Sequence, residues 1–227
     1  MLARIAVDLV ILTIQHDALC VALIRRKLEP FRGEWALPGG FVREDEALIA
    51  AATRELEEET GLRAHEVGHL EQLETFGEPK RDPRGRIVSV AHLAIAANLP
   101  ALHAATDAED AQFFQVNRRP KLAFDHDLIV RRGVERARGK LEYTPLATAF
   151  CEAPFSIADL RRVYEAVWNT ELDPANFHRK VKSTPGFVRP VTVKSAARSS
   201  SGEKGRPAQL YRAGNAKALI PPLVRPG

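Results

Sequence analysis

The chain has 227 residues, a formal net charge of +4 and 45% hydrophobic residues, which is ordinary for a globular protein of one or two domains. No apolar run reaches the roughly 18 residues that a membrane-spanning helix needs. The first apolar run is interrupted by Asp8 and lacks a small-residue cleavage site, so it predicts a strand rather than a signal peptide. The two cysteines, Cys20 and Cys151, exclude a disulfide scaffold and a CxxC metal site. They predict two buried, unpaired thiols in a cytoplasmic protein.

The net charge conceals a division between the two halves of the chain. Residues 1–120 hold 14 Lys and Arg against 19 Asp and Glu, a net charge of −5, whereas residues 121–227 hold 19 against 10, a net charge of +9. Residues 174–227 contain 11 basic residues and one acid, Glu203. This asymmetry predicts two modules, of which the second faces a polyanion. Charge alone leaves open a solvated basic tail.

The first half of the sequence predicts a mixed α/β domain. Runs rich in Val, Ile and Leu at 3–14 and 18–26 flank a short polar turn, which indicates a hairpin. Good helix formers over Glu46–Thr60, followed by Gly61 as a left-handed cap, predict a helix. Further strands are expected near 66–76, 86–97 and 112–116, with a Pro- and Arg-rich loop at 77–86.

The second half predicts helices followed by a two-stranded wing. A helix is expected from about 125 to 138, and a short one over 143–150. Ser156 and Asp159 have the spacing of a capping box ahead of an apolar helical stripe from Leu160 to Trp168. Asp173-Pro174 begins a helix to about 184, with Phe177 and Val181 pointing inward. Strands over 186–193 and 208–211 would enclose a basic tip, which completes a winged helix-turn-helix.

Three carboxylates on the first helix indicate a cation site. Glu55, Glu58 and Glu59 stand at i, i+3 and i+4, so they project from one side of the helix. Like charges at these spacings cost a helix about 0.2–0.5 kcal/mol per pair, and acids in the last turn oppose the helix dipole. A hard divalent cation, Mg²⁺ or Mn²⁺, would resolve the conflict, and Arg54 can pair with a neighbouring carboxylate. The three glutamates alone leave open a solvated acidic face.

The spacing from Gly40 to Leu62 matches the 23-residue Nudix box, G-x5-E-x7-R-E-U-x-E-E-x-G-U with U aliphatic, at every specified position. The first domain therefore resembles a Nudix domain, a family that hydrolyses nucleoside diphosphates linked to another moiety. The resemblance implies that bound metals activate water and neutralise charge on the pyrophosphate. It implies catalytic roles for Arg54, Glu55, Glu58 and Glu59, metal binding by the last three and the Gly39 carbonyl, and orientation by Arg54 and Glu46.

The Nudix box does not identify the substrate, so residues that could bind its diphosphate or its base must lie outside the box. Cations in the 80–86 loop suit a diphosphate, and aromatic rings suit a base. The candidate ligand-binding residues are Arg25, Phe31, Trp35, Arg81, Arg84 and Arg86. Phe76 is a further candidate stacking face. The alternatives are an ordinary polar hairpin loop for the cations and core or rim packing for the rings. A further acid downstream of the box is sought among Asp107, Glu109 and Asp110.

Side chains on the exposed face of the 174–184 helix can reach phosphates and base edges in the major groove of DNA. The basic tip can follow the DNA backbone or enter a minor groove. The candidate DNA-binding residues are Asn176, Arg179, Lys180, Lys182 and Ser183 on the helix, and Lys194, Arg198, Lys204 and Arg206 on the tip. A winged fold that contacts proteins is the alternative.

A Nudix domain followed by a basic winged helix resembles the Nudix-related transcriptional regulators, the NrtR family. Stretches at 81–86, 121–126, 139–145, 176–180 and 205–212 carry the likeness beyond the box. The resemblance implies a bacterial, cytoplasmic, homodimeric repressor of NAD-biosynthesis genes that senses ADP-ribose in its Nudix pocket and is released from palindromic operator DNA.

The expected fold is α+β: a Nudix α/β/α sandwich over residues 1–120, a linker helix over 121–140 and a winged helix-turn-helix over 141–227. The linker helix would transmit the effector signal. Two readings from other classes remain open. One is an active ADP-ribose pyrophosphatase, which forms AMP and ribose 5-phosphate, with an accessory basic module. The other is a scaffold that has lost both activities.

Overall fold

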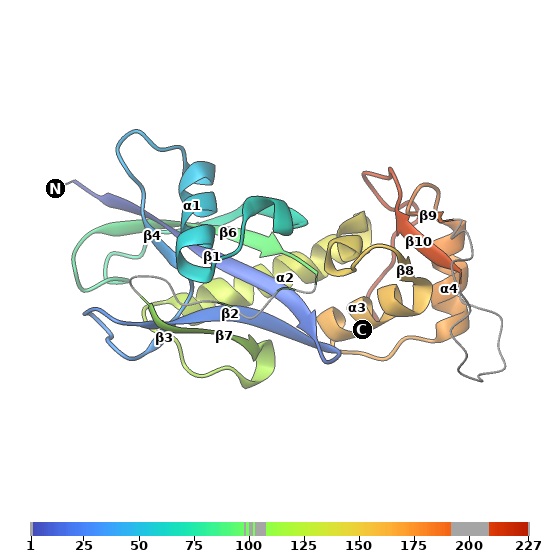
Figure 1. The fold of residues 1–227 in the computed structure, drawn as a ribbon, viewed down its shortest axis with the longest axis horizontal. Helices are drawn as coiled ribbons and strands as arrows, with labels where there is room; N and C mark the ends of the chain where they lie inside the picture. Colours follow the sequence, from blue (N-terminus) through green and yellow to red (C-terminus); the bar gives the residue numbers. More distant parts are fainter. Residues whose placement is uncertain (1, 98, 100–101, 103–107, 192–208, 227) are drawn as a thin grey trace.

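The computed structural model describes residues 2–97, 99, 102, 108–191 and 209–226. Two units lie side by side, and one long helix, α2 (His126–Tyr143), runs from the first into the second (Figure 1). No helix in the described ranges is long and apolar enough to cross a membrane. The predicted α+β architecture is confirmed, with a sheet between helices first and a winged helix after it.

The first unit is built on a seven-stranded mixed sheet. Its main path follows the order β3-β2-β1-β6-β5, while β4 pairs with β1 and β7 with β2. The β1–β6 pair is parallel and the other pairs are antiparallel. The strands are β1 (Arg4–Gln15), β2 (Ala18–Arg26), β3 (Trp35–Ala36), β4 (Gly39–Phe41), β5 (His69–Phe76), β6 (Ile87–Ile95) and β7 (Ala108–Gln115).

The predicted hairpin is confirmed as β1 and β2. Gln15 pairs with Ala18, and the two residues between them both have positive φ, 50° at His16 and 57° at Asp17. Two consecutive residues with positive φ form the turn type whose twist matches antiparallel strands. This turn therefore fixes the register of β1 on β2, whereas Asp8 pairs with Gly39 of β4 and Ala91 of β6.

Helices cover both faces of this sheet, and the side chains of β1 point alternately to one face and the other. Leu9 and Ile11 pack in one cluster with α1 (Leu48–Thr60). Val10 and Leu12 pack in another cluster with α2. The approach of α2 is so close that a Cβ added at Gly133 would lie 2.7 Å from Val10 Cγ1. Because both faces are covered, β1 is buried almost without interruption, as its apolar sequence requires.

The second unit is a winged helix with one strand more than the sequence predicts. Its antiparallel sheet has the order β8-β10-β9, and Phe155–Ser156 forms the unexpected strand. The predicted capping box is present, because Ser156 Oγ accepts from Asp159 N at 3.1 Å and Asp159 Oδ2 accepts from Ser156 N at 2.8 Å. The elements are η3 (Pro145–Phe150), β8 (Phe155–Ser156), α3 (Ile157–Trp168), α4 (Pro174–Ser183), β9 (Val188–Pro190) and β10 (Leu210–Ala213).

Helix α2 packs in both units and is longer than predicted. It continues past Gly139 to Tyr143, because Leu141 is buried in the same cluster as residues of α3. The short η1 (Ala64–Glu66) and η2 (Val116–Arg118) connect elements of the first unit. Both cysteines are free, but only Cys20 is fully buried, whereas Cys151 is half-buried. The expected linker segment is therefore part of a helix that packs in one buried cluster shared by the two units.

Candidate functional site

A cleft of about 450 Å³ lies where β4, α1, the 81–84 loop and the start of α2 meet. The carboxylate side of α1 and the glycines of β4 form one wall. The loop and the first residues of α2 form the other. Gly61 ends α1 in the left-handed conformation (φ 73°), as its sequence predicts. All residues to which the sequence assigns catalysis or metal binding line this cleft: Gly39, Arg54, Glu55, Glu58 and Glu59.

Arg54 holds the acidic side of the cleft together. Its Nε and Nη2 each donate to one oxygen of Glu46 at 2.8 Å. Its Nη1 donates to Glu55 Oε1 at 2.5 Å and to Glu58 Oε2 at 2.9 Å. The hydrogen bonds that Arg54 donates to Glu46 lower the pKa of the Glu46 carboxyl to about 2, and the same bonds are the main cause of the raised pKa of Arg54. One guanidinium thus explains how α1 tolerates its clustered carboxylates.

Gly40 allows the Glu55 carboxylate to lie on the backbone of β4, and Gly39 allows β4 to lie close to β1. A Cβ added at Gly40 would lie 2.2 Å from Glu55 Oε1, and one added at Gly39 would lie 2.2 Å from the Val7 carbonyl oxygen. Glu55 and Glu59 are both buried. Burial raises the pKa of the Glu55 carboxyl, since desolvation disfavours its charged form. The close approach explains why this segment requires glycine.

Anionic oxygens are the donors that a hard divalent cation takes. In this structure no three His, Cys, Asp or Glu side chains of the described residues converge on one cation position, because Arg54 Nη1 lies between Glu55 and Glu58 as their counter-charge. The carboxylates of the cleft are still donors of the kind that a hard divalent cation takes, and the Nudix domain implies dependence on a divalent cation in general.

Buried ion pairs stabilise the opposite wall of the cleft. Arg81 is hydrogen-bonded to Asp125 and also lies 3.3 Å from Asp8 Oδ2. His126 Nδ1 accepts from the Leu37 backbone N–H at 2.9 Å, so its Nε2 carries the proton that faces Asp8 Oδ1 at 3.4 Å. Burial lowers the pKa of His126. The neutral imidazole therefore links the sheet to the start of α2.

Arg84 presents a guanidinium that is fixed by Asp82 beside two aromatic rings. Its Nη2 and Nε donate to the two Asp82 oxygens at 2.7 and 3.0 Å. The guanidinium carbon lies 5.1 Å from the Phe41 ring centroid and 5.4 Å from that of Phe124. Burial would raise the pKa of Asp82, but the hydrogen bonds from Arg84 outweigh it and the pKa is lowered. The cleft therefore offers fixed cations and ring faces together.

The structure brings only part of the predicted ligand set to this cleft. Arg81 and Arg84 line it, whereas Arg25, Phe31, Trp35 and Arg86 do not. The side chains outside it have other contacts: Arg25 Nε donates to the Gly33 carbonyl, Phe31 packs on Phe124, Trp35 packs on Phe114, and Arg86 donates to the Gly77 carbonyl.

The other candidates of the first unit also lie away from the cleft. Phe76 is buried in the core. Glu109 and Asp110 do not line the cleft, and Asp107 lies outside the described residues. Sequence reasoning did not select several lining residues, among them Asp8, Arg26, Phe41, Phe124 and His126. Asp8 had a recognisable signal, since it is the one acid in an otherwise apolar strand.

Helix α4 presents a basic face to solvent. Phe177 and Val181 are buried, as predicted, and Arg179 Nη2 donates to Asn176 Oδ1 at 2.8 Å. Arg189 and Arg212, which the sequence analysis did not select, are exposed on paired positions of β9 and β10. The four candidates on the tip (Lys194, Arg198, Lys204, Arg206) lie outside the described residues. The five predicted α4 residues are all exposed: Asn176, Arg179, Lys180, Lys182 and Ser183.

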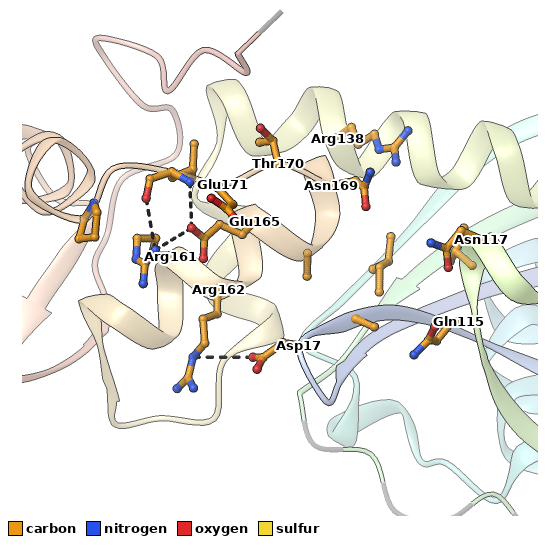
Figure 2. Close-up of a pocket in the computed structure, with 16 residues that line it drawn as sticks. Asp17, Gln115, Asn117, Arg138, Arg161, Arg162, Glu165, Asn169, Thr170 and Glu171 are labelled. Atoms are coloured by element: carbon orange, nitrogen blue, oxygen red, sulfur yellow. Dashed lines mark hydrogen bonds and ion pairs between the residues drawn. The ribbon is translucent and has the colours of Figure 1, made fainter.

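A larger cavity, about 980 Å³, lies at the junction of the two units, between the β1–β2 turn and α3 (Figure 2). Two ion pairs join charged side chains that line it. Arg161 Nη1 donates to Glu165 Oε1 at 2.6 Å, and Arg162 Nε lies 3.8 Å from Asp17 Oδ1 (Figure 2). The cavity is separate from the cleft that holds the Nudix box.

Comparison with known proteins places both units in families. Residues 2–132 match the NUDIX domain, and residues 148–213 match the NrtR DNA-binding winged helix domain. The chain is 32% identical over 210 residues to an "ADPR responsive transcriptional repressor NtrR" of Acinetobacter baylyi, covering 91% of this chain and 80% of that one. It is also 44% identical over 111 residues to an ADP-ribose pyrophosphatase of Methanocaldococcus jannaschii, covering 49% of this chain and 63% of that enzyme.

The fold is shared with a solved structure along nearly its whole length. The crystal structure of Shewanella oneidensis NrtR complexed with a 27mer DNA has a TM-score of 0.76 and 27% identity, and the match covers 97% of this chain and 99% of that one. An intact Nudix box, a basic winged helix and these relatives all lead to the same family. The chain belongs to the NrtR family of Nudix-related transcriptional regulators.

Proposed function

We propose that this protein is a transcriptional repressor that binds operator DNA through its winged helix and is released by ADP-ribose bound in the Nudix cleft. The observation that carries the proposal is the exposed basic face of α4, joined through α2 to a cleft with an intact Nudix box. The Acinetobacter baylyi relative, whose name describes a repressor responsive to ADPR, supports it.

In the cleft, we assign the diphosphate of ADP-ribose to Arg81 and Arg84, which are positioned by acidic partners. Phe41 and Phe124, beside Arg84, offer faces for stacking. Glu55, Glu58, Glu59 and the Gly39 carbonyl would hold the divalent cation, Mg²⁺ or Mn²⁺, which when bound supplies water activation and charge neutralisation at the diphosphate. Arg54 orients these carboxylates. Because Phe31 packs on Phe124, it supports the stacking face rather than contacting the ligand.

On DNA, we propose that two copies of the chain bind as a homodimer to a palindromic operator. Each α4 would enter a major groove, with half-sites about one helical turn apart. Asn176 and Arg179 near the start of α4 are placed for base contacts, and Lys180, Lys182 and Ser183 for phosphates. The regulated genes proposed are those of NAD biosynthesis and salvage, and the chain acts in the cytoplasm. Residues 1–120, 121–140 and 141–227 remain our proposed Nudix, connecting and DNA-binding segments.

A gel-shift titration combined with a turnover assay on one preparation tests the proposal. DNA from upstream of NAD-synthesis and salvage genes is bound in Mg²⁺, ADP-ribose is titrated, and AMP is measured in the same samples. Specific binding that ADP-ribose releases is the expected result. Operator affinity that is identical with and without saturating ADP-ribose would refute the effector role. Absence of any specific binding would refute the repressor.

The second candidate function is an active ADP-ribose pyrophosphatase with a basic accessory module. The intact carboxylate network around Arg54 favours it, together with the similarity to the pyrophosphatase of Methanocaldococcus jannaschii. Formation of AMP without specific DNA binding would establish this reading. Release from DNA that recovers as AMP accumulates would instead indicate a repressor that destroys its own inducer.

A further inference from the structure

Arg81 joins the effector cleft directly to the first turn of α2. Its Nε donates to Asp125 Oδ2 at 2.9 Å and its Nη2 to Asp125 Oδ1 at 2.6 Å, a two-point contact between guanidinium and carboxylate. Asp125 is the N-cap residue that directly precedes α2. The Arg81 side chain is only 4% exposed. A buried, two-point contact is geometrically specific. A shift of the Arg81 guanidinium would therefore displace Asp125 and the start of α2.

One guanidinium nitrogen of Arg81, Nη1, takes no part in the contacts with Asp125 and Asp8. Both of its hydrogen bonds to Asp125 and its contact with Asp8 use Nε and Nη2. Within the described part of the chain, Nη1 makes no hydrogen bond or ion pair, and Arg81 lines the cleft. An anion in the cleft that contacts Nη1 would therefore bind the same guanidinium that is hydrogen-bonded to Asp125.

The far end of α2 is fastened to the DNA-binding unit. Trp168 Nε1 donates to the Arg138 carbonyl at 3.1 Å, and Tyr164 Oη donates to the Leu141 carbonyl at 3.0 Å. The Tyr164 ring packs edge-on against Phe177 of α4, with centroids 5.2 Å apart. Any movement of α2 is thus passed to α3 and to the exposed face of α4.

On their other side the two units meet around the junction cavity, which Figure 2 shows. Among the described residues that line it, the ion pair between the units is Arg162–Asp17, at 3.8 Å with side chains 51% and 70% exposed. Such an exposed pair contributes little to stability. A displacement of α2 and α3 relative to the hairpin would therefore change the shape of this cavity and the packing of Leu19, which is buried in the same cluster as residues of α3.

We propose that Asp125 is the positioning residue that couples the cleft to the DNA-binding unit, acting through its contact with Arg81. This inference rests on the proposed function and names the residue through which effector binding alters operator affinity. Binding of the diphosphate to Arg81 changes the Arg81–Asp125 contact, and the first turn of α2 responds. Asp125 itself touches neither ligand.

The test compares Asp125→Asn with Asp127→Asn in the full-length chain. Asp127 is a matched control, because it lies in the same first turn of α2 and pairs with Arg119 at 2.9 Å, but does not line the cleft. The measured quantity is the ratio of operator dissociation constants with and without saturating ligand. The ligand is an ADP-ribose analogue with a methylene bridge between the phosphates, so that hydrolysis cannot deplete it. Calorimetry confirms that each variant is saturated.

In the absence of ligand, Asp125→Asn should bind operator with the affinity of the wild type. Its ratio of operator dissociation constants with and without ligand should be at least tenfold smaller than that of the wild type and close to one. Asp127→Asn should keep the wild-type ratio. By reciprocity, operator DNA should weaken binding of the analogue to the wild type and have no such effect in Asp125→Asn. A wild-type ratio in saturated Asp125→Asn would overturn the inference.

A second variant covers the case in which Asp125→Asn does not fold. Arg81→Lys keeps a cation for the diphosphate but cannot make the two-point contact with Asp125. At saturation, its ratio of operator dissociation constants with and without ligand should therefore also fall towards one. An unchanged ratio in saturated Arg81→Lys would overturn the inference as well. A ratio of one in the wild type would instead refute the proposed function, and with it this coupling.

Discussion

Two glycines of α2 provide a controlled test of how closely this helix lies on the sheet. A Cβ at Gly133 would approach Val10 Cγ1 at 2.7 Å and Val10 Cβ at 3.1 Å, whereas a Cβ at Gly139 would meet nothing within 4 Å. Val10 is fully buried in the central strand β1, so it cannot swing away. Gly133→Ala should therefore strain the core, and Gly139→Ala should not.

The magnitude follows from two opposing effects. Alanine in place of glycine favours a helix interior by about 0.8–1 kcal/mol, and both variants gain this. Overpacking of a dense core costs about 1–3 kcal/mol, and only Gly133→Ala incurs it. The difference in free energy of unfolding between the two variants should then be about 1–3 kcal/mol. For a chain of this size, each kcal/mol shifts the melting temperature by about 2–4 °C.

Urea and thermal unfolding, followed by circular dichroism, measure this difference directly. Gly139→Ala should be slightly more stable than the wild type, and Gly133→Ala less stable than Gly139→Ala. Val10→Ala combined with Gly133→Ala should recover part of the overpacking cost, because the two sites share one contact. Equal stability of the two alanine variants would refute the close packing of α2 on β1.

Three further predictions concern the sites themselves. Glu58→Gln should leave operator affinity unchanged, but it should lower any metal-dependent formation of AMP by about 100-fold or more, since it removes a proposed metal ligand. Arg179→Ala should weaken operator binding by about 1–3 kcal/mol in a gel-shift titration if Arg179 reads a base, and undiminished binding would exclude that role. The pKa of Glu46 is lowered from 4.5 to about 2, so its pairing with Arg54 stabilises the fold above pH 4.5 and is lost as the pH falls towards 2. The stability advantage of the wild type over Glu46→Gln should therefore be larger at pH 7 than at pH 3, and an advantage independent of pH would contradict the ion pair.

Features that depend on neighbouring residues could be predicted from the sequence. The hairpin turn, the Gly61 cap of α1 and the capping box at Ser156 all have short-range signals, and all three are confirmed. The Nudix box likewise lies within one segment of 23 residues. In each case the interacting groups are a few residues apart, so spacing alone specifies the geometry.

Features that depend on distant segments could not be predicted in this way. The wall of the cleft opposite α1 joins Asp8 of β1, Arg81 of the loop and His126 of α2, and no local pattern relates them. Trp35 was selected as an aromatic face, but the sequence does not say which side of the sheet its ring occupies, and it packs on Phe114. The two-residue strand at Phe155 is too short to show a period.

The energetics of the proposed switch agree with its location at the start of α2. Tenfold release of operator requires about 1.4 kcal/mol of coupling, and a hundredfold release about twice that. Hydrogen bonds to charged groups contribute about 1.5–3 kcal/mol each, and Arg81 makes two of them to Asp125 in a buried setting. Rearrangement of this one contact is therefore large enough to account for induction. The exposed Arg162–Asp17 pair across the junction is not, because pairs of that kind contribute about 0–1 kcal/mol. Coupling is accordingly expected to follow α2, whose two ends are both held by hydrogen bonds, and not the junction between the hairpin and α3.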